Sequence, residues 1–205
     1  MASERISSSL SKKQSVLSSG ISLYPFQTKA VAFGLLRKSA ALFMEQGTGK
    51  TPVALVVSGT RYLQKRVQLV LVVCPKSVVS VWSRAIRKFL AIDDALGIRF
   101  KAPRRAILAE ELREREDAQQ LTFLIVNFAS FWRHLDWFMA FDTQQLIVDE
   151  SQKAKNRQSR QTKALRKAAQ NIKYKLMLSG TPIPHSEIDL FAQYDIMNPE
   201  IFGDW

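Results

Sequence analysis

Apolar residues recur along the chain in short continuous runs, and longer stretches of mixed apolar and polar residues separate one run from the next. A short apolar run without alternation is typical of a strand that is covered on both faces of its sheet. We therefore predict buried strands within residues 41–44, 67–73, 98–100, 121–126, 146–148 and 174–178.

The stretches between these runs have the spacing of helices. After Pro75, for example, apolar residues recur at Val78, Trp82, Ile86 and Phe89, which share one face of a helix. Strands that alternate with helices indicate an α/β fold with a mostly parallel sheet and helices on both faces. We predict helices within residues 25–36, 52–57, 78–90, 103–118, 128–141, 159–169 and 187–196.

The first 22 residues depart from this pattern. Residues 1–22 are rich in serine and poor in apolar side chains, so we predict that they form a mobile tail. Residues 23–205 are long enough to form one domain with a substantial core.

Composition narrows the partners and the compartment. The formal net charge of +12 favours a polyanionic partner, with nucleic acid ahead of a membrane surface. The alternative is that the charge only keeps the protein soluble. The single cysteine, Cys74, suits a reducing compartment. No apolar stretch approaches the ~20 residues that span a bilayer, and the first residues lack a secretory signal. We therefore expect no membrane partner and a cytoplasmic location.

A first candidate site follows the first predicted strand. Gly47 and Gly49 permit a turn in which successive backbone N–H groups point inward, toward a phosphate. Lys50 would reach the β- and γ-phosphates of ATP, and the hydroxyl of Thr51 would ligate Mg²⁺. Taken alone, the turn could be an ordinary connection between a strand and a helix. The candidate nucleotide-binding residues here are Gly47, Thr48, Gly49, Lys50 and Thr51.

A second candidate site follows the fifth predicted strand, where two acids are adjacent. Asp149 would hold Mg²⁺, directly or through water, while Glu150 would orient and polarise the attacking water. Acids that cap the next helix are the alternative for an isolated pair. Because a phosphate turn precedes them, we favour Lys50, Asp149 and Glu150 as the catalytic residues of an ATP hydrolase.

Several candidate loops follow predicted strands. In a parallel sheet such loops meet at the carboxyl edge and form the site, so we expect these loops to gather there. Besides the phosphate turn they are Cys74-Pro75-Lys76, Asn127-Phe128, Asp149-Glu150 and Ser179-Gly180-Thr181.

Together these motifs resemble those of a known family. In chain order they are residues 23–27, 44–51, 72–77 with Trp82, 125–128, 149–156, 178–183 and 198–203. The sequence from about Leu23 to Gly203 resembles the first RecA-like lobe of superfamily-two helicases, and within them the Swi/Snf-type DNA translocases. The family's phosphate loop also lacks the first glycine, which Met44 replaces here.

The resemblance implies further roles. Gln27 would hydrogen-bond the adenine of ATP. The residues that would contact DNA are Lys76, Ser77, Asn127 and Lys155. The residues that would couple the ATP state to movement are Gln152, Ser179, Gly180 and Thr181.

Three positions depart from the family pattern: Gln152 stands where His is usual, Pro184-His185 replace Gln-Asn, and Arg84 replaces a common acid. The glutamine at position 152 puts in question how the ATP state is relayed to Ser179 and Thr181, although an amide can make a comparable hydrogen bond. No second lobe or arginine finger follows in this sequence, and such a finger is typically worth ~10³–10⁵ in rate. We expect an isolated lobe to be nearly inactive.

The positive charge is concentrated in one segment. Residues 151–186 contain no acid, and such a run could neutralise several phosphates. The alternative is a solvated helix face, because Arg160, Lys163 and Lys167 lie at helical spacing. We assign Trp82, Trp132 and Trp137 to the core. The basic residues are Lys153, Lys155, Arg157, Arg160, Lys163, Arg166, Lys167, Lys173 and Lys175.

The leading hypothesis is the ATP-binding lobe of a DNA-dependent ATPase, which uses ATP and Mg²⁺ and moves along double-stranded DNA when joined to a second lobe. A strand-separating or restriction-type helicase lobe shares every motif. A non-catalytic DNA-binding module with a vestigial ATP site is a further alternative, against which the intact residues 49–51 and 149–150 argue. The compact sequence suggests a bacterial or phage source; a eukaryotic protein would be nuclear.

Overall fold

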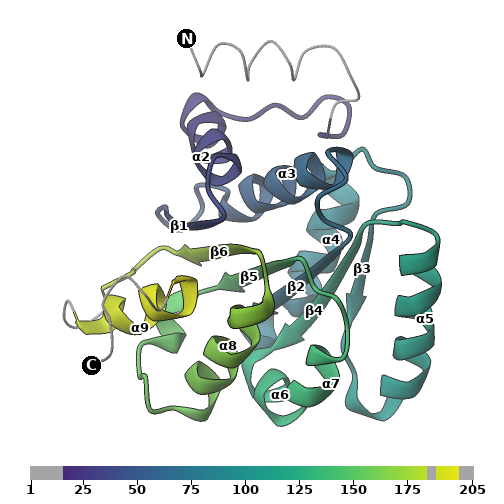
Figure 1. Cartoon of the computed structure of the whole chain (residues 1–205). Coiled ribbons are helices and arrows are strands. Elements are labelled where there is room, and N and C mark those ends of the chain that lie inside the picture. The colour runs from purple at the N-terminus through teal and green to yellow at the C-terminus, as the bar shows by residue number, and fades with distance from the viewer. Residues whose placement is uncertain (1–15, 184–187, 199–205) are drawn as a thin grey trace.

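The computed structural model describes residues 16–183 and 188–198. Within them, parallel strands form one six-stranded sheet in the order β1-β6-β5-β2-β4-β3 (Figure 1). The strands are β1 (Ser39–Phe43), β2 (Leu69–Cys74), β3 (Leu96–Arg99), β4 (Thr122–Asn127), β5 (Gln145–Asp149) and β6 (Tyr174–Ser179). This sheet confirms the predicted α/β fold, and β6 lies between the phosphate-turn strand and the acidic strand.

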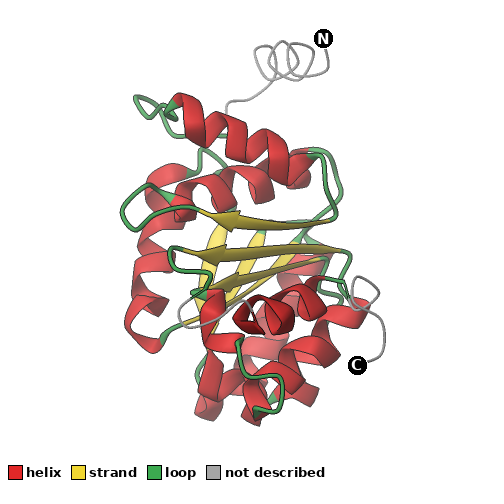
Figure 2. Cartoon of the chain, turned by 90° about the vertical axis from the view of Figure 1, so that its left-hand side faces the viewer, coloured by secondary structure: helices red, strands yellow, loops and turns green. Residues whose placement is uncertain are grey.

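Helices cover both faces of the sheet, and Figure 2 shows the strands between two helical layers. One core packs α2, α3 and α4 against the sheet, and a second core packs α5 to α9 against the other face. The helices are α2 (Pro25–Leu35), α3 (Lys50–Leu63), α4 (Val79–Phe89), α5 (Arg105–Asp117), α6 (Phe128–Arg133), α7 (Leu135–Met139), α8 (Arg160–Asn171) and α9 (Ile188–Met197). The 3-10 turns are η1 (Lys76–Val78), η2 (Ala102–Arg104) and η3 (Ser151–Ala154).

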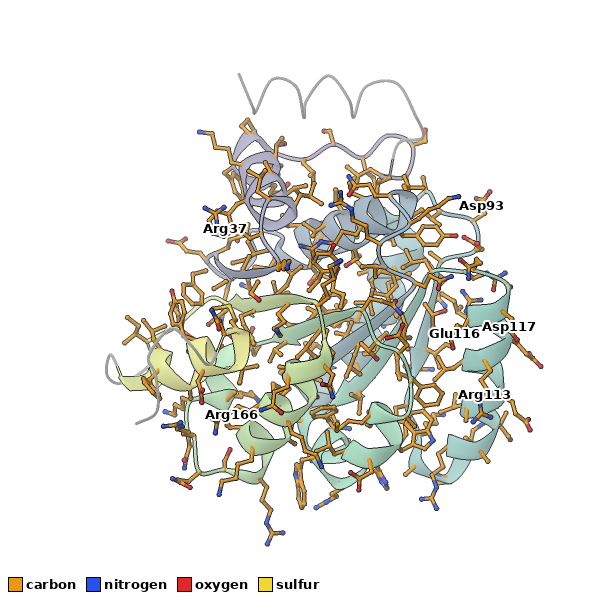
Figure 3. The ribbon with its side chains drawn as sticks, viewed as in Figure 1. Arg37, Asp93, Arg113, Glu116, Asp117 and Arg166 are labelled. Atoms are coloured by element: carbon orange, nitrogen blue, oxygen red, sulfur yellow. The ribbon has the colours of Figure 1, made fainter. Side chains whose placement is uncertain are left out.

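The charged helix α5 has the exposed outer face that its sequence predicts. Only Leu108 and Leu112 are buried among its residues. Arg113, Glu116 and Asp117 lie on its outer side (Figure 3). Among the described residues, no helix is long and apolar enough to cross a membrane.

Ordered structure begins earlier than the sequence suggested. Val16 is 7% exposed, and its carbonyl accepts a hydrogen bond from Ala91 N at 2.9 Å. Ser18 N donates to Phe89 O at 2.9 Å. The prediction of a mobile tail is therefore wrong for residues 16–18, which pair with Phe89, Leu90 and Ala91 at the end of α4. Residues 1–15 lie outside the described part of the chain.

The predicted helix over residues 128–141 is also wrong in part, since it is two helices. His134 has φ −123° and ψ 28°, which ends α6 and starts α7. The break lets Phe138 contact both Phe131 and Phe100, with ring centroids 5.4 and 4.7 Å apart. The aromatic content that suggested one helix instead forms this cluster.

A buried arginine joins α3 to two neighbouring elements. Arg61 is 1% exposed, and its guanidinium donates to Gly34 O at 2.7 Å, Arg37 O at 2.8 Å and Gln145 Oε1 at 3.0 Å. Burial lowers its pKa to about 10. The side chain thus supplies donors to the end of α2, whose last carbonyls have no partner inside the helix.

Candidate functional site

The phosphate turn connects β1 to α3 and has the backbone that its glycines predict. Gly47 and Gly49 have φ angles of 77° and 85°, which side chains rarely adopt. Space is also restricted at Gly49, where an added Cβ would lie 2.3 Å from Gln27 Nε2. The turn ends at Gly49, which caps the start of α3.

Lys50 folds back over this turn. Its Nζ donates to Met44 O at 3.0 Å and to Glu45 O at 3.1 Å. The hydroxyl of Thr48 donates to Glu45 O at 2.6 Å, which also tightens the turn. Thr51 lies in the first turn of α3 and is partly exposed. The ammonium group therefore lies inside the turn, where an anion would meet it.

Gln27 links α2 to the phosphate turn. Its Nε2 donates to Thr48 O at 2.8 Å, and its Oε1 accepts from Tyr24 N at 2.9 Å. One amide N–H and one lone pair remain for a ligand. Beside it, the exposed rings of Tyr24 and Phe26 stack with centroids 5.9 Å apart and an interplanar angle of 5°.

Asp149 lies at the carboxyl end of β5 and is held by two donors. Trp82 Nε1 donates to Oδ2 at 2.8 Å, and Glu150 N donates to Oδ1 at 3.1 Å. Burial raises the pKa of Asp149, and the nearby Glu150 charge raises it further. The Trp82 hydrogen bond and the positive charge of Lys50 act in the opposite direction.

Glu150 belongs to a chain of side-chain hydrogen bonds that crosses to β6. Gln152 Nε2 donates to Glu150 Oε2, and Gln152 Oε1 accepts from Ser179 Oγ at 2.8 Å. The hydroxyl oxygen of Ser179 accepts in turn from Thr181 N at 3.1 Å. The amide at position 152 therefore joins the acidic loop to the loop after β6.

The loop after β6 also touches the phosphate turn. An added Cβ at Gly180 would lie 3.1 Å from Gln46 Cγ and 3.4 Å from Lys50 Nζ. One backbone hydrogen bond, from Met44 N to Ser179 O at 3.1 Å, extends the pairing of β1 and β6 into these loops. The structure thus brings the predicted phosphate, acidic and coupling residues together at one edge.

The four residues predicted to contact DNA lie at or just after the carboxyl ends of β2, β4 and β5. Lys76 and Ser77 are exposed on η1, and Lys155 is partly exposed after η3. Asn127 has a structural role as well, because its Oδ1 accepts from Ser130 N at 2.9 Å and caps α6.

Part of the positive charge of residues 151–186 is neutralised by an acid of the same chain. Asp195 on α9 is 4% exposed and lies 3.3 Å from Arg157 Nε and 2.6 Å from Arg166 Nε. Arg160 lies over the ring of Trp132, 5.4 Å from its centroid. Arg157 and Arg166 are therefore paired within the fold, while Arg160 is exposed. The motif positions Pro184-His185 and 199–203 lie outside the described residues.

Two site residues escaped the sequence reasoning. Trp82 is buried as predicted, at 1% exposed, but it also supplies the donor to Asp149. Gln193 on α9 accepts from Ser151 Oγ at 2.6 Å and donates to Pro182 O at 2.9 Å, so it ties η3 to the loop after β6. The donor role of Trp82 can be recognised only once Asp149 is known to lie within hydrogen-bonding distance. The spacing of residues along the sequence gives no sign of the role of Gln193.

Known proteins resemble this chain in sequence and fold. It is 29% identical over 201 residues to Protein CHROMATIN REMODELING 19 of Arabidopsis thaliana, covering 88% of this chain and 25% of that protein. It is 29% identical over 198 residues to the DNA repair and recombination protein RAD54 of rice (Oryza sativa subsp. japonica), covering 89% of this chain and 20% of that protein. The chain therefore spans about a quarter or less of the length of these relatives.

The fold is similar to that of the Sulfolobus solfataricus SWI2/SNF2 ATPase core, solved in complex with double-stranded DNA. The TM-score is 0.76 at 24% identity, over 90% of this chain and 37% of that one. A family model described as the SNF2-related domain matches residues 26–205. With its RecA-like sheet and its phosphate turn, the chain belongs to the SNF2-related domain family.

Proposed function

We propose that this chain is the ATP-binding lobe of a DNA-dependent ATPase, which moves along double-stranded DNA when it is joined to a second lobe. The observation that carries the proposal is the hydrogen-bonded chain from Glu150 through Gln152 to Ser179, which ends beside the phosphate turn. Family membership supports it. So do relatives whose names describe chromatin remodeling and DNA repair.

The phosphate turn would bind the triphosphate. The amine of Lys50 would exchange the carbonyls of Met44 and Glu45 for phosphate oxygens, which are charged and therefore stronger acceptors. The start of α3 adds N–H donors and the positive end of the helix dipole. Gln27 would use its remaining N–H and lone pair on the adenine edge.

The acids would act on the γ-phosphate side. Mg²⁺ bound with a nucleotide takes one or two protein oxygens and completes its shell with phosphate and water, so the Thr51 hydroxyl and Asp149 carboxylate fit it. Bound Mg²⁺ would offset charge on the phosphate oxygens. Glu150 would accept a hydrogen bond from the attacking water and orient it, while Gln152 holds its other oxygen.

Movement needs DNA and a second lobe. Lys76 and Ser77 are exposed on η1, where they would contact the phosphate backbone, with Asn127 at the end of β4 and Lys155 after η3 beside them. ATP would close the two lobes on DNA, and hydrolysis would reopen them. The second lobe would add an arginine finger worth ~10³–10⁵ in rate.

The decisive experiment measures DNA-stimulated ATP hydrolysis in a polypeptide that carries both lobes. Lys50→Ala and Glu150→Gln are each expected to abolish hydrolysis. Glu116→Gln, on the exposed face of α5, is the matched control and is expected to leave the rate unchanged. Normal activity in either site variant would refute the assignment.

The isolated chain separates this proposal from a vestigial site. Residues 1–205 are expected to bind an ATP analogue weakly and to turn over ATP at a near-zero rate, because the second lobe would supply the arginine finger. Robust DNA-stimulated hydrolysis by the isolated chain would contradict the need for a second lobe. Salt-dependent DNA binding without any ATP-analogue binding would favour a non-catalytic module.

A further inference from the structure

The edge strand β1 has one unpaired side. At its ends, Lys38 O accepts from Lys175 N at 2.8 Å and Met44 N donates to Ser179 O at 3.1 Å, so the even-numbered residues bond to β6. Alternate residues of a parallel strand point their N–H and C=O groups to the other side. Among the described residues, no backbone hydrogen bond reaches that side. The residues that face it are Ser39, Ala41 and Phe43.

A groove of about 860 Å³ runs along this open edge. Ser39 and Ala41, which have small side chains, form the bottom of the groove. Residues from the end of α2, from α8 and from α9 form its walls. Figure 3 labels Arg37, beside α2, and Arg166, on α8, which belong to opposite walls.

The groove is basic. No aspartate or glutamate occurs among its described lining residues, and Arg166 already pairs with Asp195. Lys175 is half-buried in the groove, where burial lowers its pKa. An acidic group beside it would compensate the cost of that burial. The basic lining residues are Arg37, Lys38, Arg166, Lys173 and Lys175.

We propose that the β1 edge binds an extended acidic peptide segment of a partner protein, which adds to the sheet as a further parallel or antiparallel strand. Such a strand satisfies both the N–H and the C=O groups of the three outward residues. A phosphate backbone offers acceptors only, so it would leave the three outward carbonyls without donors. The backbone pattern therefore favours a peptide over nucleic acid.

Strand geometry defines the partner further. Side chains two residues apart share a face, and five residues of β1 extend about 17 Å. Acids at alternate positions of the partner would lie on the face of the sheet that Lys175 shares with Ser39, its register partner, while apolar residues between them would lie on the α2 side, toward Phe33, which is 39% exposed. This proposal does not rest on the ATPase function.

The first test uses a fluorescein-labelled synthetic peptide of alternating glutamate and valine, and follows fluorescence anisotropy with the whole chain. Saturable binding is expected. A peptide of the same sequence with N-methyl groups on all of its backbone amides cannot donate hydrogen bonds along either edge, and is expected to bind at least tenfold more weakly. Equal binding of the two peptides, or no binding of either, would overturn the proposal.

Hydrogen exchange locates the bound peptide. The amides of Ser39, Ala41 and Phe43 are expected to exchange at least fivefold more slowly with peptide bound, while the amides of β3, the opposite edge of the sheet, stay unchanged. Protection at β3 alone would place the peptide elsewhere and overturn the proposal.

Charge variants complete the test. The double variant Lys173→Gln, Lys175→Gln is expected to weaken peptide binding about fivefold, since each exposed pair is worth little on its own. The matched control is Lys153→Gln with Lys163→Gln, which removes equal charge outside the groove and is expected to bind normally. A DNA duplex that protects the β1 amides, with no peptide binding, would make the groove a nucleic-acid surface and refute the proposal.

Discussion

The hydrogen bond between Trp82 and Asp149 gives a direct test of how the acidic strand is held. Trp82→Phe removes the indole N–H that donates to Asp149 Oδ2 at 2.8 Å. Water cannot readily replace this donor, because the two residues are 1% and 8% exposed. A hydrogen bond to a charged group is worth about 1.5–3 kcal/mol, and the smaller ring leaves a cavity that costs about 1 kcal/mol more.

The assay is a double-mutant cycle in the free energy of unfolding, measured by urea denaturation. Trp82→Phe alone is expected to lose about 2.5–4 kcal/mol. In an Asp149→Ala background the acceptor is gone, so the same change is expected to cost about 1.5–3 kcal/mol less. The difference isolates the hydrogen bond from the lost packing.

Trp137→Phe is the matched control, because this indole packs against Phe100 and Phe138 rather than against the acidic loop. Its cost is expected to be the same with and without Asp149→Ala, within about 0.5 kcal/mol. If Trp82→Phe and Asp149→Ala were additive within the same margin, the argument that Trp82 positions the carboxylate would be refuted.

Other substitutions test the turn, the relay and the core. Gly49→Ala is expected to lower the free energy of unfolding in urea by about 1 kcal/mol more than Gly47→Ala, because only a Cβ at position 49 displaces the Gln27 amide from Thr48 O. In a Gln27→Ala background the two glycine variants should lose the same free energy, and a remaining difference would contradict this reason. In a two-lobe polypeptide, Gln152→Ala is expected to lower DNA-stimulated hydrolysis at least tenfold while Gln152→His retains most of it, and a normal rate in the alanine variant would disprove the relay. Burial raises the pKa of Cys74 to about 12, so its thiol stays protonated at pH 8 and iodoacetamide should label it only as fast as the chain unfolds; rapid labelling of the folded chain would contradict its burial.

The elements that the sequence predicts well are those with a local signal. The buried strands are continuous apolar runs, so their number and order along the chain follow from composition over a few residues. The left-handed φ angles of Gly47 and Gly49 follow from residue type alone. The gathering of loops at one edge then follows from parallel strands, without knowledge of any side-chain contact.

What the sequence does not predict depends on partners far along the chain. Asp195 neutralises Arg157 and Arg166 from a different helix, so the basic segment is less available than its charge suggests. The donor role of Trp82 requires Asp149, 67 positions later. Val16 is buried within a serine-rich stretch because Gly59 of α3 leaves room for it; a Cβ added at Gly59 would lie 2.6 Å from Val16 Cγ1. Composition and local pattern do not predict contacts of this kind, because each depends on one residue that is distant in the sequence.

The glutamine at position 152 shows how a departure from a family pattern can preserve a function. Its amide donates to Glu150 and accepts from Ser179 at the same time, which a neutral imidazole could also do with its two ring nitrogens. A protonated imidazole has two donors and no acceptor, so it could not accept the hydrogen bond that the Ser179 hydroxyl donates, whereas an amide does not titrate. The substitution therefore keeps the connection between the acidic loop and β6 and removes its dependence on pH near neutrality. Hydrolysis by the Gln152→His variant of a two-lobe polypeptide should accordingly fall, relative to wild type, as the pH drops below about 6.5.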